Sequence, residues 1–134
     1  MCTVGDIILV NQFKNNGENI GQHSFVVLNT DKGQIGGLDY NLMCNMMSSF
    51  KSEKHRKRKL SFDENFPVTH SDVTVKNGNN REGYIKADQL YYFDKKKIDY
   101  VVIGKMNPDT FRKVIELIKK LENIKLIVDN LEGT

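Results

Sequence analysis

The chain has 134 residues and a formal net charge of +3, with 39% hydrophobic and 28% charged residues. This length suits one compact domain, and the composition excludes both a disordered chain and a membrane-embedded one. No apolar run approaches the roughly 20 residues of a bilayer span, and the N-terminus has no charged-then-apolar signal pattern. We therefore expect a single cytoplasmic domain over residues 1–134, without a membrane partner.

Short apolar runs separated by polar turns predict strands in the first half of the chain. These strands cover residues 5–10, 23–29 and 38–49. Residues 11–22 are polar and contain glycine, which predicts a loop, and residues 30–37 hold turns around a brief pairing at Gln34 and Ile35. The run 38–49 is rich in Met and Leu, which also suits a helix, but its alternation and its place between strands favour a strand.

The second half begins with KSEKHRKRK, residues 51–59, which hold six Lys or Arg against one carboxylate. We expect this run to form an exposed, mobile loop. Further strands are predicted over residues 66–75, at the start of 84–93 and over 98–106, and the apolar tail 123–134 is expected to dock.

The most strongly patterned helix begins after Asn107, which suits an N-cap, with Pro108 at the first helical position. Apolar residues then recur at three- and four-residue spacing up to Leu121. Several short strands and a closing amphipathic helix predict a small barrel-like α+β domain.

The cysteines and histidines do not form a metal motif. Cys2 and Cys44 are expected to be free, reduced thiols, and Cys44 lies in an apolar stretch that favours a small buried hydrophobe over a nucleophile. His23, His55 and His70 lack ligand spacing, so we expect neither a metal nor another cofactor. The sequence also has no P-loop, GxGxxG, HExxH or GxSxG motif.

Polar residues at predicted strand ends are the remaining candidates for chemistry. They are His23, Ser48, Ser49, Lys51, Arg81, Lys86 and Asp88. Each also has a structural interpretation, because histidine and serine satisfy strand ends and turns, lysine and arginine face solvent, and Asp88 suits a helical cap. Taken singly, these residues indicate only a weakly basic α+β domain.

The order of the elements over about residues 5–121 resembles the MazF/PemK-type toxin ribonucleases. Their Gly-X-Arg-Pro motif, followed by aliphatic residues, is matched by GQHSFVVL, with His23 at the arginine position and Ser24 at the proline position. LMCNMMSSFK is similar to the family's next core strand, whose terminal hydroxyl falls on Ser48. In REGYIKADQL, Lys86 and Asp88 align with a basic and an acidic residue implicated in RNA cleavage by the PemK branch.

The SSFK segment also resembles the ToxN-type ribonucleases, whose active strand ends in paired hydroxyls and a lysine. Ser48, Ser49 and Lys51 match that pattern. The resemblance implies an SH3-like (PemK/MazF-type) antiparallel β-barrel with a C-terminal amphipathic helix. It also implies a homodimer, a cognate antitoxin that is either protein or RNA, and an endoribonuclease that leaves a cyclic phosphate and a 5′-hydroxyl.

Such cleavage needs a base for the 2′-hydroxyl, an acid for the 5′-oxygen and groups that stabilise the phosphorane. His23 suits the acid or base, because imidazole has an unperturbed pKa of about 6.5. Lys51 would neutralise phosphate charge. Ser48 would donate a hydrogen bond to a non-bridging oxygen, and Ser49 would help to position it. The RNA-binding candidates are Lys54, Arg56, Lys57, Arg58, Lys59, Arg81, Lys86 and Asp88, and Phe13, Phe50, Phe62 and Phe66 are candidates for base stacking.

The sequence is also compatible with two other functions. One is a non-catalytic nucleic-acid-binding module on the same barrel, and the other is a domain that binds a protein through a hydrophobic groove. Cleavage of RNA in EDTA separates the enzyme from the binding module. Salt-insensitive binding to a protein, without RNA affinity, indicates the interaction domain.

Overall fold

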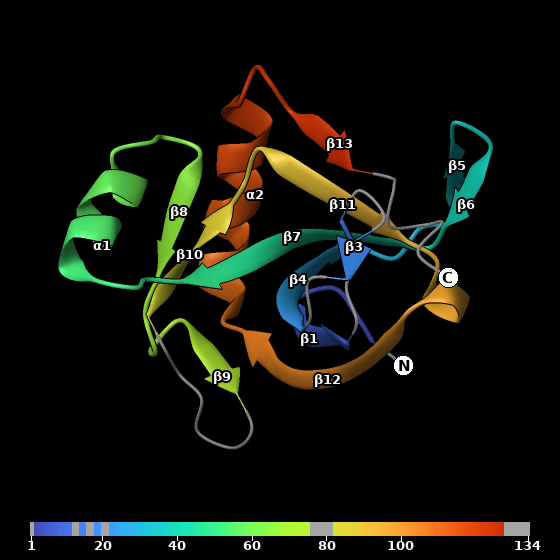
Figure 1. Ribbon diagram of the computed structural model, residues 1–134, viewed down its shortest axis with the longest axis horizontal. Coiled ribbons are helices and arrows are strands. Elements are labelled where there is room, and N and C mark those ends of the chain that lie inside the picture. Colours follow the sequence, from blue (N-terminus) through green and yellow to red (C-terminus); the bar gives the residue numbers. More distant parts are fainter. Residues whose placement is uncertain (1, 12–13, 16–17, 20–21, 76–81, 128–134) are drawn as a thin grey trace.

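The computed structural model describes residues 2–11, 14–15, 18–19, 22–75 and 82–127 (Figure 1). Nine of the described strands form one sheet, which curls into a nearly closed barrel. Its strands are β1 (Asp6–Asn11), β4 (His23–Asn29), β7 (Leu42–Ser49), β8 (Asn65–Val68), β9 (Val73–Val75), β10 (Gly83–Lys86), β11 (Gln89–Phe93), β12 (Asp99–Met106) and β13 (Lys125–Ile127). With the C-terminal helix α2 (Pro108–Lys120), this architecture confirms the predicted fold class.

The strand order is β13-β11-β7-β4-β1-β12-β9, and β10 pairs with both β7 and β8. The pairings are antiparallel, except that β13 runs parallel to β11. The last element therefore docks on the sheet, as predicted for the described part of the tail, while residues 128–134 lie outside the described residues.

The core lies inside the barrel and is held by aliphatic and aromatic side chains. Ile7, Ile8 and Val10 of β1 are almost completely buried. The Phe25 ring meets the rings of Tyr91 and Phe93 edge-on, at centroid distances of 5.2 and 5.1 Å. Such pairs add to the free energy that burial of the rings already contributes.

Cys44 is also buried in this core, and both Cys2 and Cys44 are free, as predicted. Burial raises the pKa of the Cys44 thiol well above its ordinary value, with a further contribution from Cys2. A protonated thiol is a poor nucleophile. Cys44 therefore acts as a small hydrophobic residue, which is the role the sequence favoured.

Helix α2 begins where its capping signals predict. The Asn107 side chain accepts a hydrogen bond from the Asp109 N–H at 2.9 Å, and Pro108 opens the first turn. Val114 is fully buried, and Phe111 and Ile115 pack against the core. The helix thus turns its apolar face to the sheet.

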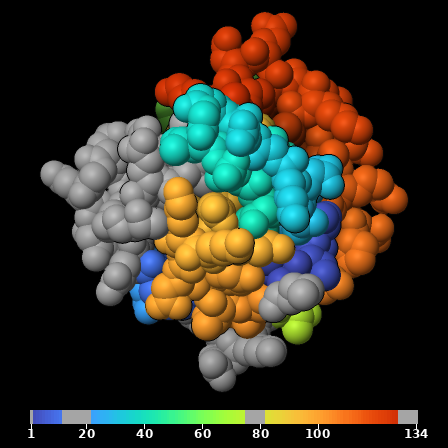
Figure 2. Space-filling model, turned by 90° about the vertical axis from the view of Figure 1, so that its right-hand side faces the viewer, coloured from blue at the N-terminus to red at the C-terminus, as the bar shows by residue number. Residues whose placement is uncertain are grey.

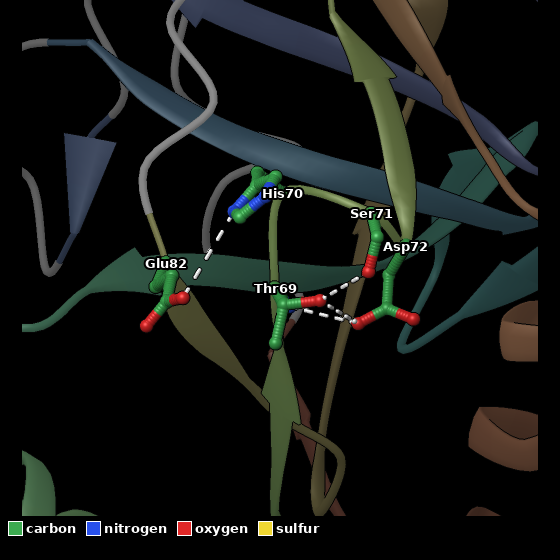
Figure 3. Close-up of polar contacts among 5 residues, drawn as sticks. All are labelled: Thr69, His70, Ser71, Asp72 and Glu82. Carbon is green, nitrogen blue, oxygen red and sulfur yellow. Dashed lines mark hydrogen bonds and ion pairs between the residues drawn. The ribbon is translucent and has the colours of Figure 1, made fainter.

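The predicted continuous strand over residues 66–75 is wrong, because a turn separates β8 from β9 (Figure 3). One Asp72 carboxylate oxygen accepts hydrogen bonds from the Thr69 N–H at 2.8 Å and the Thr69 hydroxyl at 3.0 Å. The other accepts from the Thr110 hydroxyl of α2 at 2.9 Å. Burial alone would raise the pKa of Asp72, but these donors and Lys113 hold it below its ordinary value. The turn is therefore tied to the helix.

The predicted loop over residues 51–59 is also wrong, because residues Glu53–Leu60 form helix α1. Ser52 is its N-cap and accepts a hydrogen bond from the His55 N–H at 3.1 Å. Glu53 in the first turn, and Lys57 to Lys59 in the last, suit the helix dipole, and Lys and Arg are good helix formers. The helix lies outside the barrel, beside β8 (Figure 1).

Two hairpins and a 3-10 turn complete the described chain. β5 (Gly33–Ile35) pairs with β6 (Leu38–Tyr40), which confirms the predicted pairing at Gln34 and Ile35. The run 38–49 is extended, as predicted, but Asn41 divides it into β6 and β7, which belong to different sheets. Within the predicted loop 11–22, β2 (Lys14–Asn15) pairs with β3 (Glu18–Asn19). Figure 2 shows the β5–β6 hairpin against the segment that contains the 3-10 turn η2 (Lys95–Lys97).

Candidate functional site

A groove of about 1260 Å³ opens where the end of β7 meets helix α1 and the start of β4. Strands β10, β11 and β13 supply its other residues. Seven of its lining residues are lysine, arginine or histidine: His23, Lys51, His55, Arg58, Lys59, Lys86 and Lys125. Among the described residues that line the groove, none is aspartate or glutamate. A concave surface with one sign of charge attracts an anionic ligand.

The groove brings together all four residues predicted for catalysis and part of the predicted RNA-binding set. His23, Ser48, Ser49 and Lys51 all line it, as do Arg58, Lys59 and Lys86. The predicted RNA-binding residues Lys54, Arg56, Lys57 and Asp88 are not part of the lining, and Arg81 lies outside the described residues. Their roles stay predictions.

The aromatic candidates are also divided. Phe50 lines the groove and stacks on Tyr84, with ring centroids 5.3 Å apart. Phe62 is exposed away from this lining, and Phe66 packs against the core. Phe13 lies outside the described residues. Phe50 is therefore the predicted stacking residue that the fold presents to the groove.

The pairing of β10 with β7 presents the two serines. Tyr84 lies opposite Ser48 and Gly83 opposite Ser49, while Ser24 of β4 is opposite Met47 on the other side. A Cβ atom at residue 83 would collide with the backbone carbonyl oxygen of Ser48. Glycine is required there because the two backbones approach so closely.

A buried asparagine shapes the part of the groove that β10 and β11 form. Ile85 is opposite Met47 and Tyr91 is opposite Cys44, so six positions along β10 and β11 span three along β7. Asn45 is fully buried at this bulge, and its amide nitrogen donates to the carbonyl oxygens of Lys86, at 3.2 Å, and Gln89, at 2.9 Å. Because Lys86 and Gln89 both line the groove, Asn45 fixes the backbone from which they project.

Tyr91 and Asp88 lie at the same bulge. The Tyr91 hydroxyl donates to the Gln89 side chain at 3.1 Å, and burial, together with the charge of Asp88, raises the pKa of Tyr91 to about 12. Tyr91 is thus a neutral hydrogen-bond donor near neutral pH. Burial raises the pKa of the Asp88 carboxyl, and Glu64 adds to that shift. The Asp88 backbone carbonyl accepts a hydrogen bond from the Lys125 N–H at 2.7 Å, which anchors β13.

Sequence reasoning missed His55, Tyr84, Gln89, Tyr91 and Lys125 as groove residues. Tyr84 and Tyr91 resemble ordinary core residues of an apolar strand, and Lys125 lies in a tail without a motif. His55 had a detectable signal, because it follows an N-cap serine by three residues. Within the described part of the chain, no three His, Cys, Asp or Glu side chains gather as metal ligands.

Comparison with known families gives one match that covers most of the chain. The sequence profile of the PemK-like, MazF-like toxins of type II toxin-antitoxin systems matches residues 3–121. No curated protein matches the sequence. None of the described helices combines the length and apolar character needed to cross a bilayer.

Proposed function

Because the chain belongs to the family of PemK-like, MazF-like toxins of type II systems, we propose that it is a toxin that acts as an endoribonuclease. Members of this family are known as endoribonucleases, and the type II class implies a protein antitoxin as partner. The proposed molecule is a single ribonuclease domain that works as a homodimer in the cytoplasm. Its match to the ToxN-type ribonucleases in the SSFK segment stays a prediction.

The observation that supports RNA as the ligand is the charge of the groove. Five lysines or arginines line the groove together with Ser48 and Ser49, and no described lining residue is acidic. RNA presents a phosphate at every nucleotide, so each cation that meets a phosphate adds salt-sensitive affinity. A hydrophobic protein-binding groove would not need this arrangement.

In the proposed mechanism, the 2′-hydroxyl attacks the adjacent phosphorus, and the bond to the 5′-oxygen breaks. The products are a 2′,3′-cyclic phosphate and a 5′-hydroxyl, and no water or metal ion enters the reaction. His23 serves as the proton-transfer group, because a neutral imidazole accepts the 2′-proton and its conjugate acid returns a proton to the leaving oxygen. His23 occupies the position at which the family has arginine. The proposed proton transfer by histidine is therefore specific to this chain.

The remaining groups act on the negative charge of the phosphorane. Ser48 donates a hydrogen bond to a non-bridging oxygen, Ser49 helps to position it, and Lys51 neutralises charge. Lys86, held by the Asn45-bound bulge, is placed on another part of the lining and supplies a second cation. These roles need the side chains to face one groove, and all four residues line it.

The test is cleavage of single-stranded RNA by the purified chain in EDTA, with analysis of both new ends. We expect cyclic phosphate and 5′-hydroxyl ends, and slower cleavage by Ser48→Ala. RNA binding without cleavage would instead support the non-catalytic module. Absence of RNA affinity, with salt-insensitive capture of a protein, would support the interaction domain.

A further inference from the structure

We propose that His55 is a positioning residue that fixes the basic helix α1 at the rim of the groove, through its Nδ1 atom and its ring. The consequence for RNA rests on the proposed function, whereas the effect on the helix does not. His55 lies in the run that the sequence presents as a solvent-exposed cluster of charge. In the structure, its ring lies on the side of α1 that faces Phe50 and Tyr84.

Helix α1 needs such an attachment because it has no buried residue. An eight-residue helix is too short to be stable in water alone, and most helical stability in proteins comes from packing of an apolar face. At its C-terminal end, the Asn65 side chain of β8 donates to the Lys59 carbonyl oxygen at 2.9 Å. The N-terminal end must be held by other contacts.

His55 supplies these contacts. Its Nδ1 accepts a hydrogen bond from the Lys51 N–H at 3.1 Å, while its own N–H donates to the Ser52 hydroxyl. The arrangement resembles a capping box with histidine in place of the usual Glu or Gln, except that the N–H bound by the side chain belongs to Lys51, the residue before the N-cap. The imidazole centroid also lies 6.2 Å from the Tyr84 ring and 6.4 Å from the Phe50 ring. Because Tyr84 is buried in β10, the helix start is joined to the barrel.

The contact with Lys51 requires a neutral ring. An Nδ1 atom that accepts a hydrogen bond carries no proton, so the neutral imidazole has its proton on Nε2. Desolvation lowers the pKa of His55, and the charges of Arg58, Lys59 and Lys51 lower it further. On the same part of α1, Arg56 lies 3.7 Å from Glu53 and 5.8 Å from the centroid of the Phe50 ring. Tyr84 is the titratable group that faces His55 from β10.

The attachment matters for the groove because α1 carries part of its charge. Lys51, Arg58 and Lys59 all line the groove, and the Lys59 ammonium lies 6.0 Å from the Tyr84 ring centroid. If the start of α1 moved, these cations would no longer stand at a fixed distance from Ser48 and Ser49. His55 therefore sets how many phosphates the groove meets at once, without entering the reaction.

The first test needs no RNA. The ¹⁵N spectrum of the His55 ring should show a proton on Nε2, and the protection factors of the α1 amides against hydrogen exchange should fall when acid protonates Nδ1. His55→Asn keeps an acceptor near the Nδ1 position, and His55→Phe keeps the ring without an acceptor. We expect the Asn variant to retain most of the protection at pH 7, and the Phe variant to lose it. A proton on Nδ1, or equal protection in both variants, would overturn the proposal.

The second test measures RNA cleavage with the same variants, and His70→Ala as an exposed-histidine control. We expect His55→Phe to raise KM about tenfold, with kcat within about twofold, and with a shallower dependence of affinity on salt. His55→Asn should restore most of the affinity. A loss of kcat with unchanged KM would overturn the positioning role. If the wild-type chain neither binds nor cleaves RNA, the proposed function fails, while the exchange result still decides the role of His55 in α1.

Discussion

The two walls of the groove are built in different ways. The sheet wall consists of β4, β7 and the β10–β11 bulge, whose backbone is supported by fully buried side chains such as Phe25, Cys44 and Asn45. The helix wall is α1, which has no buried residue and is held by a cap, a few rings and one amide hydrogen bond. We therefore expect substitutions in the sheet wall to destabilise the fold more than substitutions in α1.

The two walls also have different roles in the proposed function. His23, Ser48 and Ser49 stand on the sheet wall, where the strands hold reacting groups at fixed separations. The helix wall supplies Arg58 and Lys59, which need only be near a flexible phosphate chain. Substitutions on the sheet wall should therefore change chemistry and stability, and those on the helix wall should change affinity.

The largest effect is expected from His23→Ala. Removing a proton-transfer group should lower the single-turnover cleavage rate by about 10²–10⁴-fold, because general acid–base catalysis contributes about that much. RNA affinity, measured by fluorescence anisotropy, should change little. A variant that cleaves at the wild-type rate would show that the chemistry belongs to other residues, of which Ser48 and Lys51 are the first to test.

The stability of the two walls should differ by several kcal/mol. Phe25→Ala removes a ring that is 0% exposed, so the free energy of unfolding should fall by about 3–5 kcal/mol. Lys57→Ala on α1 changes an exposed side chain and should shift the free energy of unfolding by less than about 0.5 kcal/mol. Urea unfolding followed by circular dichroism measures both. Comparable losses would mean that α1 is integral to the core.

Asn45→Ala tests the support of the bulge. The substitution leaves two partly buried carbonyl oxygens without their donor, which should cost about 1–3 kcal/mol in the free energy of unfolding. Cleavage should fall as well, because Lys86 and Gln89 lose their fixed backbone. The exposed Asn107→Ala, which removes the cap of α2, serves as a control that lowers stability away from the groove. Equal cleavage by the two variants would show that Asn45 does not support the site.

The smallest effect is expected from the helix wall. Arg58→Ala combined with Lys59→Ala should make the plot of log affinity against log salt shallower by about 1.4, if each residue meets one phosphate of single-stranded RNA. The pair Lys54→Ala and Lys57→Ala removes the same charge from the same helix, but from residues outside the groove lining. This control should change the slope less. Identical slopes would indicate that only the net charge of α1 matters.

The sequence predicted the elements whose signals are local. The alternating run at residues 23–29 and the capped, periodic helix after Asn107 both have the predicted type and place. Helix α1 was missed because its charge run outweighed the Ser52 cap and the good helix propensity of Lys and Arg. The turn at Thr69–Asp72 was missed because apolar alternation continues on both sides of it.

The site could be predicted only in part, for a related reason. The resemblance to the toxin ribonucleases led to His23, Ser48 and Lys51, since their motifs lie at strand ends. Asn45 and Tyr84 carry no motif, and their roles depend on a bulge and a ring stack formed between strands that are about 40 residues apart. Single-sequence patterns do not encode such pairings.

Apart from the branch that ends at β8, the described sheet ends on two strands of three residues, β13 and β9. An edge strand offers unpaired N–H and C=O groups to any other chain, and it is a common origin of aggregation. Three residues provide a very short template, and β13 begins with a lysine, which disfavours further strand addition. By lying along β11, β13 also covers a longer edge. Truncation before Lys125 would therefore be expected to increase self-association as well as to alter the groove.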